Sequence, residues 1–412
     1  MKHYTDPREF KKHRVKIVKH DMLIPDYKIE EVTSSFNNSN KWHLSKYNIP
    51  SYWESTQGEG IKILMLDTGL PNHKDLDSRV YKNQNLTAED WEDLNGHQTH
   101  CCGIIAGSNT GVAPKASITC DKVLNKNGTG SFLAVLRSLE LSLDNKFDIV
   151  SMSLGGNPPS DKGLIKAMRE IIDEYNKKNK VVFCSAGNSG TQGVKFPALL
   201  YNTISIGAHD QNEKIAYFSS KGEQVDFAAP GVNIYSTFLN QQYASLSGTS
   251  MACPFLVGIT SLMLSKHKKQ EKEGKPNDCK TPEQIFNHLK RCSIDKGIEG
   301  KDSDYGYGII NIQGLLDTEE PKKPEEPEEP EEPENPEEPE EPEEPKEPID
   351  KKTSWFKKNI AWVFFGIFLS TALIFLVFSQ CSKEDVPKPP YVDEQGNIDW
   401  DKKFEEEKNN KK

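Results

Sequence analysis

Three short motifs contain the residue types of a nucleophilic relay. Asp67 stands in Asp-Thr-Gly, His97 in His-Gln-Thr-His, and Ser250 in Gly-Thr-Ser-Met-Ala. In such a relay the Asp orients an imidazole, the His accepts a proton from a hydroxyl, and the Ser attacks a carbonyl carbon. We therefore predict that Asp67, His97 and Ser250 together carry out acyl transfer.

Acyl transfer also needs hydrogen-bond donors for the negative charge that develops on the carbonyl oxygen. Ser250 opens a predicted helix, whose N-terminal amide and positive dipole end suit this task. Asn188 follows an apolar run and can donate a side-chain N–H. Taken singly, Asp-Thr-Gly is also an ordinary turn and a single His is more often a packing or surface residue. The five-residue Gly-Thr-Ser-Met-Ala motif is far more specific, and the order of all three favours catalysis.

Short apolar runs alternate with helix-length patterns and would position these motifs. The runs 61–66, 148–152, 181–184 and 203–206 are rich in β-branched residues, and residues 133–144 and 164–177 have helical patterns. Strands buried on both faces and joined by helices predict a three-layer α/β fold with a mostly parallel sheet. Ligands bind at the carboxyl ends of such strands, where the motifs stand.

The chain resembles the subtilisin-like serine proteases (subtilases), in particular the bacterial intracellular subtilisins, over about residues 20–316. The resemblance is carried by 49–53, 66–69, 111–114, 122–126, 148–156, 185–188, 229–231 and 247–252. It implies a subtilisin-like fold and broad endopeptidase activity on proteins or peptides. It also implies that Asp67, His97 and Ser250 are the triad and Asn188 the oxyanion donor. By the same resemblance, the substrate-binding walls are formed by Ser153, Leu154 and Gly155 on one side and by Ala186 and Gly187 on the other.

The sequence departs from the family pattern in two places near the predicted site. Gln98 stands where the family nearly always has Gly, so we expect its side chain beside the substrate cleft. A catalytically impaired, protease-like binding module is therefore the alternative function. The loop 103–112 is too short for the family's usual calcium loop. We therefore predict no metal in the site and no cofactor for the chemistry, with a structural calcium possible but unsupported.

By the same resemblance, Lys195 falls where the base of the S1 pocket would lie if the shortened loop before it keeps the family's register. A lysine there would favour Glu or Asp at the P1 position through charge pairing. The alternative is that Lys195 points to solvent.

Residues 1–45 form a polar, basic N-terminal extension before the expected peptidase domain, residues 46–316. Intracellular subtilisins carry a Leu-Ile-Pro-aromatic segment that blocks the active site, and Leu23, Ile24 and Pro25 match it, with Asp26 as one inserted residue. We therefore predict an inhibitory prosegment, and the alternative is a disordered arm.

A Pro-Glu spacer is expected over residues 317–350. Proline recurs at every third position from 321 to 348, a period typical of a stiff polyproline II helix, although a disordered tract is equally compatible. Residues 321–348 hold fourteen Glu and three Lys, a net charge of −11, whereas the whole chain of 412 residues carries −10. The rest is therefore nearly neutral, and we expect no nucleic-acid partner.

Residues 359–381 are predicted to span a membrane. The apolar run of 360–378 would reach about 29 Å as a helix, close to the thickness of a hydrocarbon core. A buried core helix is disfavoured because the run lacks a polar face. Five lysines precede the span and two follow it within fifteen residues, and residues 1–19 lack a signal-peptide pattern. We therefore expect a single-pass protein with a cytoplasmic peptidase domain and an outer tail, residues 382–412. An outside peptidase is the alternative, and the oligomeric state stays open.

The eight cysteines have one adjacent pair and otherwise wide gaps. This spacing fits neither a zinc knuckle nor a disulfide framework, so we expect free thiols in a reducing compartment. Cys101, Cys102 and Cys253 are expected to pack around the catalytic residues. Sensitivity to thiol reagents is the alternative.

Overall fold

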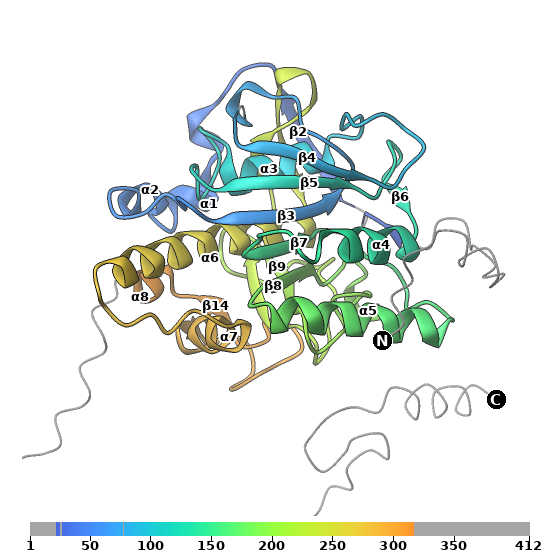
Figure 1. Cartoon of the computed structure of the whole chain (residues 1–412). Coiled ribbons are helices and arrows are strands. Elements are labelled where there is room, and N and C mark those ends of the chain that lie inside the picture. The colour runs from blue at the N-terminus through green and yellow to red at the C-terminus, as the bar shows by residue number, and fades with distance from the viewer. Residues whose placement is uncertain (1–21, 25–26, 77, 317–412) are drawn as a thin grey trace, which may run out of the picture. The chain divides into compact units, whose positions relative to one another are not determined.

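The computed structural model describes residues 22–24, 27–76 and 78–316 (Figure 1). Pro25, the predicted spacer 317–350, the predicted membrane span 359–381 and the tail 382–412 lie outside these residues. Within the described part of the chain, no helix is both long and apolar enough to cross a membrane. Contacts divide the chain into Met1–Lys322 and Lys323–Lys412, and the description below concerns the first unit.

A nine-stranded sheet forms the centre of this unit, in the order β13-β14-β10-β9-β8-β7-β3-β5-β4. Neighbouring strands are parallel except for β13, which is antiparallel to β14. The prediction of a mostly parallel α/β sheet is thus confirmed. Its strands are β3 (Lys62–Asp67), β4 (Val80–Asn85), β5 (Ser117–Lys122), β7 (Ile149–Met152), β8 (Val181–Ser185), β9 (Ile204–His209), β10 (Phe227–Pro230), β13 (Ser293–Ile294) and β14 (Ile309–Ile310).

Helices pack on the sheet in two groups. Helix α3 (His97–Ala106) packs against α6 (Thr249–Lys272), and α6 also contacts β7, β8, β9 and β10. Helices α4 (Phe132–Ser142) and α5 (Lys162–Lys177) pack together, apart from α6, and α5 contacts β8 (Figure 1). Helix α5 buries Ile165, Met168, Ile172 and Tyr175, a spacing of three to four residues that gives one apolar face.

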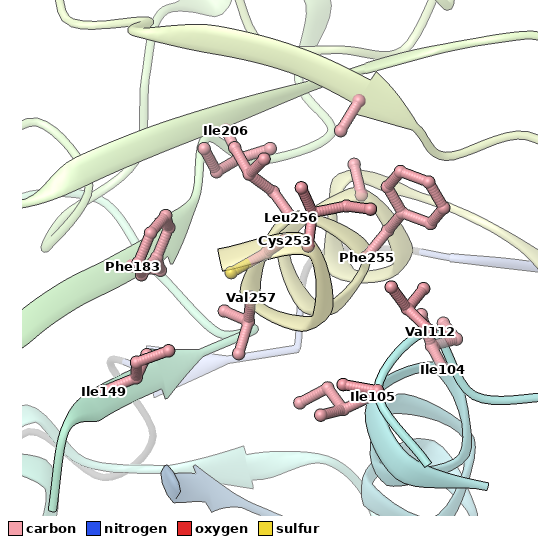
Figure 2. Close-up of a cluster of buried hydrophobic side chains, with 14 of the residues drawn as sticks. Ile104, Ile105, Val112, Ile149, Phe183, Ile206, Cys253, Phe255, Leu256 and Val257 are labelled. Atoms are coloured by element: carbon pink, nitrogen blue, oxygen red, sulfur yellow. The ribbon is translucent and has the colours of Figure 1, made fainter. Parts of the chain in front are cut away.

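Helix α6 is the centre of the core because its first four turns are buried on all sides. Figure 2 shows Cys253, Phe255, Leu256 and Val257 of this helix surrounded by apolar side chains. Those side chains belong to α3, the segment after it and the central strands, and they include Ile104, Ile105, Val112, Ile149, Phe183 and Ile206. The N-terminus of α6, where Ser250 lies, is therefore held rigidly.

Two small antiparallel sheets bring the N-terminal segment onto this body. Strand β2 (Lys28–Thr33) pairs with β12 (Tyr243–Ser247), which also pairs with β11 (Ile234–Thr237). Strand β1 (Met22–Leu23) pairs with β6 (Thr129–Gly130). The remaining elements are η1 (Asn38–Asn40), α1 (Trp42–Ser45), α2 (Ile49–Tyr52), η2 (Lys74–Leu76), η3 (Gly190–Gln192), η4 (Leu239–Gln241), α7 (Pro282–Arg291) and α8 (Ile312–Leu316).

Candidate active site

The predicted site residues gather at the carboxyl ends of the central strands. Asp67 is the last residue of β3, and Ser153 follows β7, the strand next to it in the sheet. In the sheet, β5 and then β4 lie on one side of β3, and β7 and then β8 lie on its other side. The direction of the sheet thus switches between β3 and β7, and the carboxyl ends of strands at such a switch are the usual place for a ligand in a parallel sheet.

Asp67 and His97 form a buried pair. Both carboxylate oxygens of Asp67 lie 2.9 Å from His97 Nδ1, and both side chains are fully buried. His97 opens α3 directly after Gly96, whose φ of 95° is a left-handed conformation suited to glycine. Among the described residues, the other ring nitrogen of His97, Nε2, has no hydrogen-bond partner. An Asp on one nitrogen leaves the other available as a base.

Asp93 holds the turn after β3 and the start of α3 together. One of its carboxylate oxygens accepts from Thr68 Oγ1 (2.8 Å) and from the backbone N–H of Gly96 (2.9 Å). The other accepts from both the N–H and the hydroxyl of Thr99. Our sequence reasoning missed this residue, because the usual capping signal is a polar residue at the N-cap itself and the N-cap of α3 is Gly96. Asp93 therefore ties the residue after Asp67 to the residues on either side of His97.

Ser250 lies in the first turn of α6, and Pro254 follows four residues later in the same helix. Proline has no N–H, so the Ser250 carbonyl lacks its usual helical donor. Instead it accepts hydrogen bonds from Ser153 Oγ (3.0 Å) and Cys101 Sγ (3.3 Å). The Ser250 hydroxyl donates to the backbone carbonyl of Ser153 at 3.2 Å. Ser250 is therefore tied to the loop after β7 through both its backbone and its side chain.

Asn188 is fixed against the residue before Ser250. Its side-chain oxygen accepts from the backbone N–H and the hydroxyl of Thr249, at 2.9 and 2.8 Å. The same hydroxyl accepts from the backbone N–H of Gly187 at 3.1 Å. Because its oxygen is committed to Thr249, the carboxamide of Asn188 is held in one orientation.

The structure corrects the expectation for Gln98. Its side chain is fully buried, and its Oε1 accepts a 2.6 Å hydrogen bond from the backbone N–H of Gly69. Its own N–H donates to Thr68 Oγ1. Gln98 therefore packs behind the turn that follows Asp67 and supports it, instead of standing beside the cleft.

The predicted pocket walls come together around Lys195. A β-carbon placed on Gly187 would lie 2.5 Å from Lys195 Cγ, and one on Gly155 would lie 3.1 Å from Lys195 Cβ. The aliphatic stem of Lys195 thus packs against both walls. Its ammonium donates to Asn157 Oδ1 at 2.9 Å, a bond that is exposed to solvent.

The N-terminal segment lies between the predicted substrate-binding strands. The N–H of Leu23 donates to the Gly155 carbonyl at 3.0 Å, and the N–H of Gly155 donates to the Leu23 carbonyl at 2.9 Å. On its other side Leu23 pairs with Thr129 of β6, and Ile24 N–H donates to the Gly128 carbonyl. Strand β1 therefore lies between the segment that contains Gly155 and strand β6.

Side chains of the same segment enter the site. Met22 and Ile24 are buried while Leu23 is exposed, the alternation expected of a strand. Three residues beyond Ile24, the Tyr27 ring lies 5.2 Å from the ring centre of His97, and its hydroxyl donates to Asn95. Burial, together with the nearby Asp67 carboxylate, raises the pKa of Tyr27 to about 12. Our sequence reasoning named Leu23 and Ile24 but missed Met22 and the contact of Tyr27 with His97.

Cys101, Cys102 and Cys253 are all fully buried free thiols near these residues. Burial raises the pKa of Cys253 to about 12 and holds the pKa of the other two well above the usual range. The reactive thiolate form is therefore disfavoured, which supports a packing role.

Comparison with known proteins agrees with this geometry. The model of the subtilase family (Peptidase S8) matches residues 58–308. Subtilisin Savinase of Lederbergia lenta is 34% identical over 278 residues, which cover 66% of this chain and 97% of that protein. Thermitase of Thermoactinomyces vulgaris is 37% identical over 237 residues, covering 55% and 83%. The minor extracellular protease Epr of Bacillus subtilis is 31% identical over 294 residues, but the chain spans only 43% of its length.

Proposed function

Because the chain belongs to the subtilase family of serine endopeptidases, we propose that it hydrolyses peptide bonds with Asp67, His97 and Ser250 as its catalytic triad. Asn188 is proposed as the side-chain donor to the oxyanion. The observation that carries the proposal is the buried contact of both Asp67 carboxylate oxygens with His97 Nδ1. This contact fixes the tautomer that leaves Nε2 as the base.

In the proposed reaction His97 Nε2 takes the proton of the Ser250 hydroxyl as Ser250 Oγ attacks the scissile carbonyl carbon. The charge that develops on the carbonyl oxygen is stabilised by the N-terminus of α6 and by Asn188. His97 then gives the proton to the leaving amine, and water hydrolyses the acyl-enzyme by the same steps. In the described state the Ser250 hydroxyl donates to the Ser153 carbonyl. Attack therefore requires a rotation of the Ser250 side chain toward His97.

Labelling with a fluorophosphonate probe tests this proposal, because the probe reacts only with an activated serine. We expect a chain that begins at residue 41 to be labelled, and the full chain to be labelled less because residues 22–27 cover the site. Ser250→Ala should not be labelled in either chain. Ser153→Ala is the matched control, since it removes a neighbouring buried hydroxyl and should leave labelling detectable. Labelling that persists in Ser250→Ala would contradict the assignment of the nucleophile.

The alternative of a catalytically impaired binding module depended on Gln98 obstructing the cleft. The buried position of Gln98 behind the Asp67 turn removes the reason for that alternative. We therefore retain the peptidase as the single proposed activity, acting on protein or peptide substrates without a cofactor.

We also propose that residues 22–27 inhibit the enzyme in its resting form. The support is that β1 takes the strand position between Gly155 and β6, where an extended substrate would pair, and that Tyr27 covers the His97 ring. Removal of this segment would open the site. The proposed inhibition thus uses backbone pairing, which a substrate of almost any sequence can imitate.

Membrane attachment through residues 359–381, with the peptidase domain on the cytoplasmic side, is a further proposal that is supported by the apolar run of 360–378 and the excess of lysines before it. Alkaline extraction of membranes is the test. The full chain should stay in the pellet, and a chain ending at residue 350 should be extracted. Cleavage of the peptidase domain by protease added to sealed cells would contradict the cytoplasmic placement.

A further inference from the structure

A second cluster of ligand-type side chains lies at the other end of α6 from Ser250. His267 belongs to the last turns of α6, Asp278 and Cys279 belong to the connection after it, and His288 belongs to α7. One ligand atom from each of these four residues lies within 4.8 Å of the ligand atoms of the others. Two helices and their connection thus converge on one point.

The two histidines of this cluster are buried without satisfying their polar atoms. His267 and His288 are each 5% exposed. Within the described part of the chain, both ring nitrogens of His267 and Nε2 of His288 lack a hydrogen-bond partner. A buried polar atom without a partner costs about 1–3 kcal/mol, so two neighbouring rings with such atoms call for an explanation, and a metal ion can bind one nitrogen of each ring.

The donor set is that of a zinc site. Imidazole nitrogen, thiolate sulfur and carboxylate oxygen are the ligands of tetrahedral Zn²⁺, with Zn–N near about 2.0 Å and Zn–S near about 2.3 Å. Such bond lengths place neighbouring ligand atoms roughly 3.3–3.8 Å apart. His267 Nδ1 and Cys279 Sγ already lie 3.6 and 3.8 Å from Asp278 Oδ1, and His288 Nδ1 lies 3.9 Å from Asp278 Oδ2.

One positive group stands at the edge of the cluster. Arg291 Nη2 lies 2.8 Å from His288 Nδ1 and 3.6 Å from Asp278 Oδ2. The Arg291 side chain is 57% exposed, so it can turn into solvent when a cation binds. Asp278 is similarly exposed and can close the remaining distance.

We propose that His267, Asp278, Cys279 and His288 bind one zinc ion that fastens the end of α6 to α7. Binding forms four metal–ligand bonds and releases the Cys279 thiol proton to solvent, with no change of oxidation state. His267 is seventeen residues from Ser250 along α6, or about 26 Å, so the ion takes no part in peptide hydrolysis. With four protein ligands the site is closed and structural.

This site is difficult to predict from the sequence because its ligands are of three types and are spread over 22 positions. The cysteine spacing does not match a zinc knuckle, the pattern by which cysteine ligands are usually recognised. The fold supplies the proximity, because the connection after α6 turns back and places α7 beside the last turns of that helix.

Titration with Co²⁺, and then with Zn²⁺, tests the proposal. The full chain carrying Ser250→Ala, which prevents self-cleavage, is stripped of metal with a chelator and titrated with Co²⁺. We expect one equivalent to give the intense visible bands and the thiolate charge-transfer band of tetrahedral cobalt, and Zn²⁺ to displace it. Cys279→Ser should remove the charge-transfer band and weaken zinc binding at least about 100-fold.

Three further variants keep the test decisive. Cys292→Ser changes a thiol just outside the cluster and should keep the band. His288→Gln should also lose tetrahedral metal binding. This variant provides a second test of the ligand set if Cys279→Ser does not fold. Asp67, His97 and Cys101 also lie close enough to hold a metal ion. A band that survives Cys279→Ser and disappears in Cys101→Ser, or no tetrahedral band at all, would overturn the proposal.

Discussion

The side-chain oxygen of Asn188 accepts two hydrogen bonds from Thr249, one from its backbone N–H and one from its hydroxyl. Thr249 directly precedes Ser250 in α6, so the proposed oxyanion donor and the proposed nucleophile are held by one residue. The position of the Asn188 carboxamide relative to Ser250 is therefore set by contacts of a single residue, Thr249.

Replacing Thr249 with Val should therefore lower kcat by about tenfold and leave KM nearly unchanged. Valine keeps the shape and the backbone N–H but loses the hydroxyl that orients the Asn188 carboxamide. Loss of a whole oxyanion donor costs about 10²–10³ in kcat, and a misoriented donor should cost less. Steady-state kinetics on a peptide substrate measures the effect. Thr249→Ser keeps the hydroxyl and should retain most of the activity, and an equal loss in both variants would contradict this role.

Replacing Leu23 with Pro should raise the activity of the full chain. Proline removes the N–H that donates to the Gly155 carbonyl and so weakens the pairing of β1. Leu23→Ala is the matched control, because the Leu23 side chain is 46% exposed and its backbone bonds remain. Initial rates should rise severalfold in the proline variant alone. Equal rates in wild type and Leu23→Pro would speak against inhibition by this segment.

Replacing Lys195 with Met should abolish a preference for acidic P1 residues. The Lys195 stem lies between Gly155 and Gly187, so its ammonium can reach a carboxylate that enters between these walls. We expect kcat/KM for a Glu P1 peptide to fall at least about tenfold relative to the matching Gln peptide. Lys214→Met removes an exposed charge elsewhere and should change neither rate. A wild-type preference for bulky apolar P1 residues would disprove the assignment.

Acidification should destabilise the fold through buried histidines. Burial lowers the pKa of His43 and His100 to about 3 and that of His209 to about 4, against an ordinary value near 6.5. Between about pH 6.5 and pH 4, all three histidines stay neutral in the folded chain but are protonated in the unfolded chain. Their stabilising contribution is therefore complete above pH 6.5 and declines as the pH falls toward 4. Near pH 5 these three groups together should lower the free energy of unfolding by about 4 kcal/mol per pH unit.

Urea unfolding as a function of pH isolates one of these contributions. His43→Phe keeps an aromatic ring against Phe255 but removes the titrating group. Between pH 6 and 4.5 its unfolding free energy should fall less steeply than that of the wild type, by about 1.4 kcal/mol per pH unit. Above pH 7.5 the two slopes should coincide. Parallel curves at low pH would show that His43 does not carry this dependence.

Local sequence patterns predicted the parts of the fold that depend on local spacing. The runs 61–66, 148–152, 181–184 and 203–206 correspond to β3, β7, β8 and β9 within three residues, and residues 133–144 and 164–177 correspond to α4 and α5 within two. Each is buried on both faces or has a regular apolar stripe, which the local spacing of apolar residues reveals. Asp67 and Asn188 could be placed because they stand at or just after the ends of such strands.

Contacts between distant segments could not be predicted in this way. Strand β2 is mostly exposed and charged, and it is a strand only because β12, more than 200 residues later, pairs with it. The burial of Gln98 depends on the Gly69 amide, and the cluster around His267 depends on the return of the chain from α6 to α7. These features arise from tertiary packing, which a single sequence does not encode locally.

Strand β2 begins only five residues after Leu23 and pairs along β12. Strand β1 is therefore tethered close to Gly155, with which it pairs. A strand on so short a tether competes with substrate as an intramolecular ligand at an effective concentration in the millimolar range. Even weak intrinsic pairing is then sufficient to keep dilute substrates out, while the same residues supplied as a free peptide would inhibit poorly. Cutting the chain between β1 and β2 would remove this advantage in a single step, because the released strand would dilute into the surrounding volume.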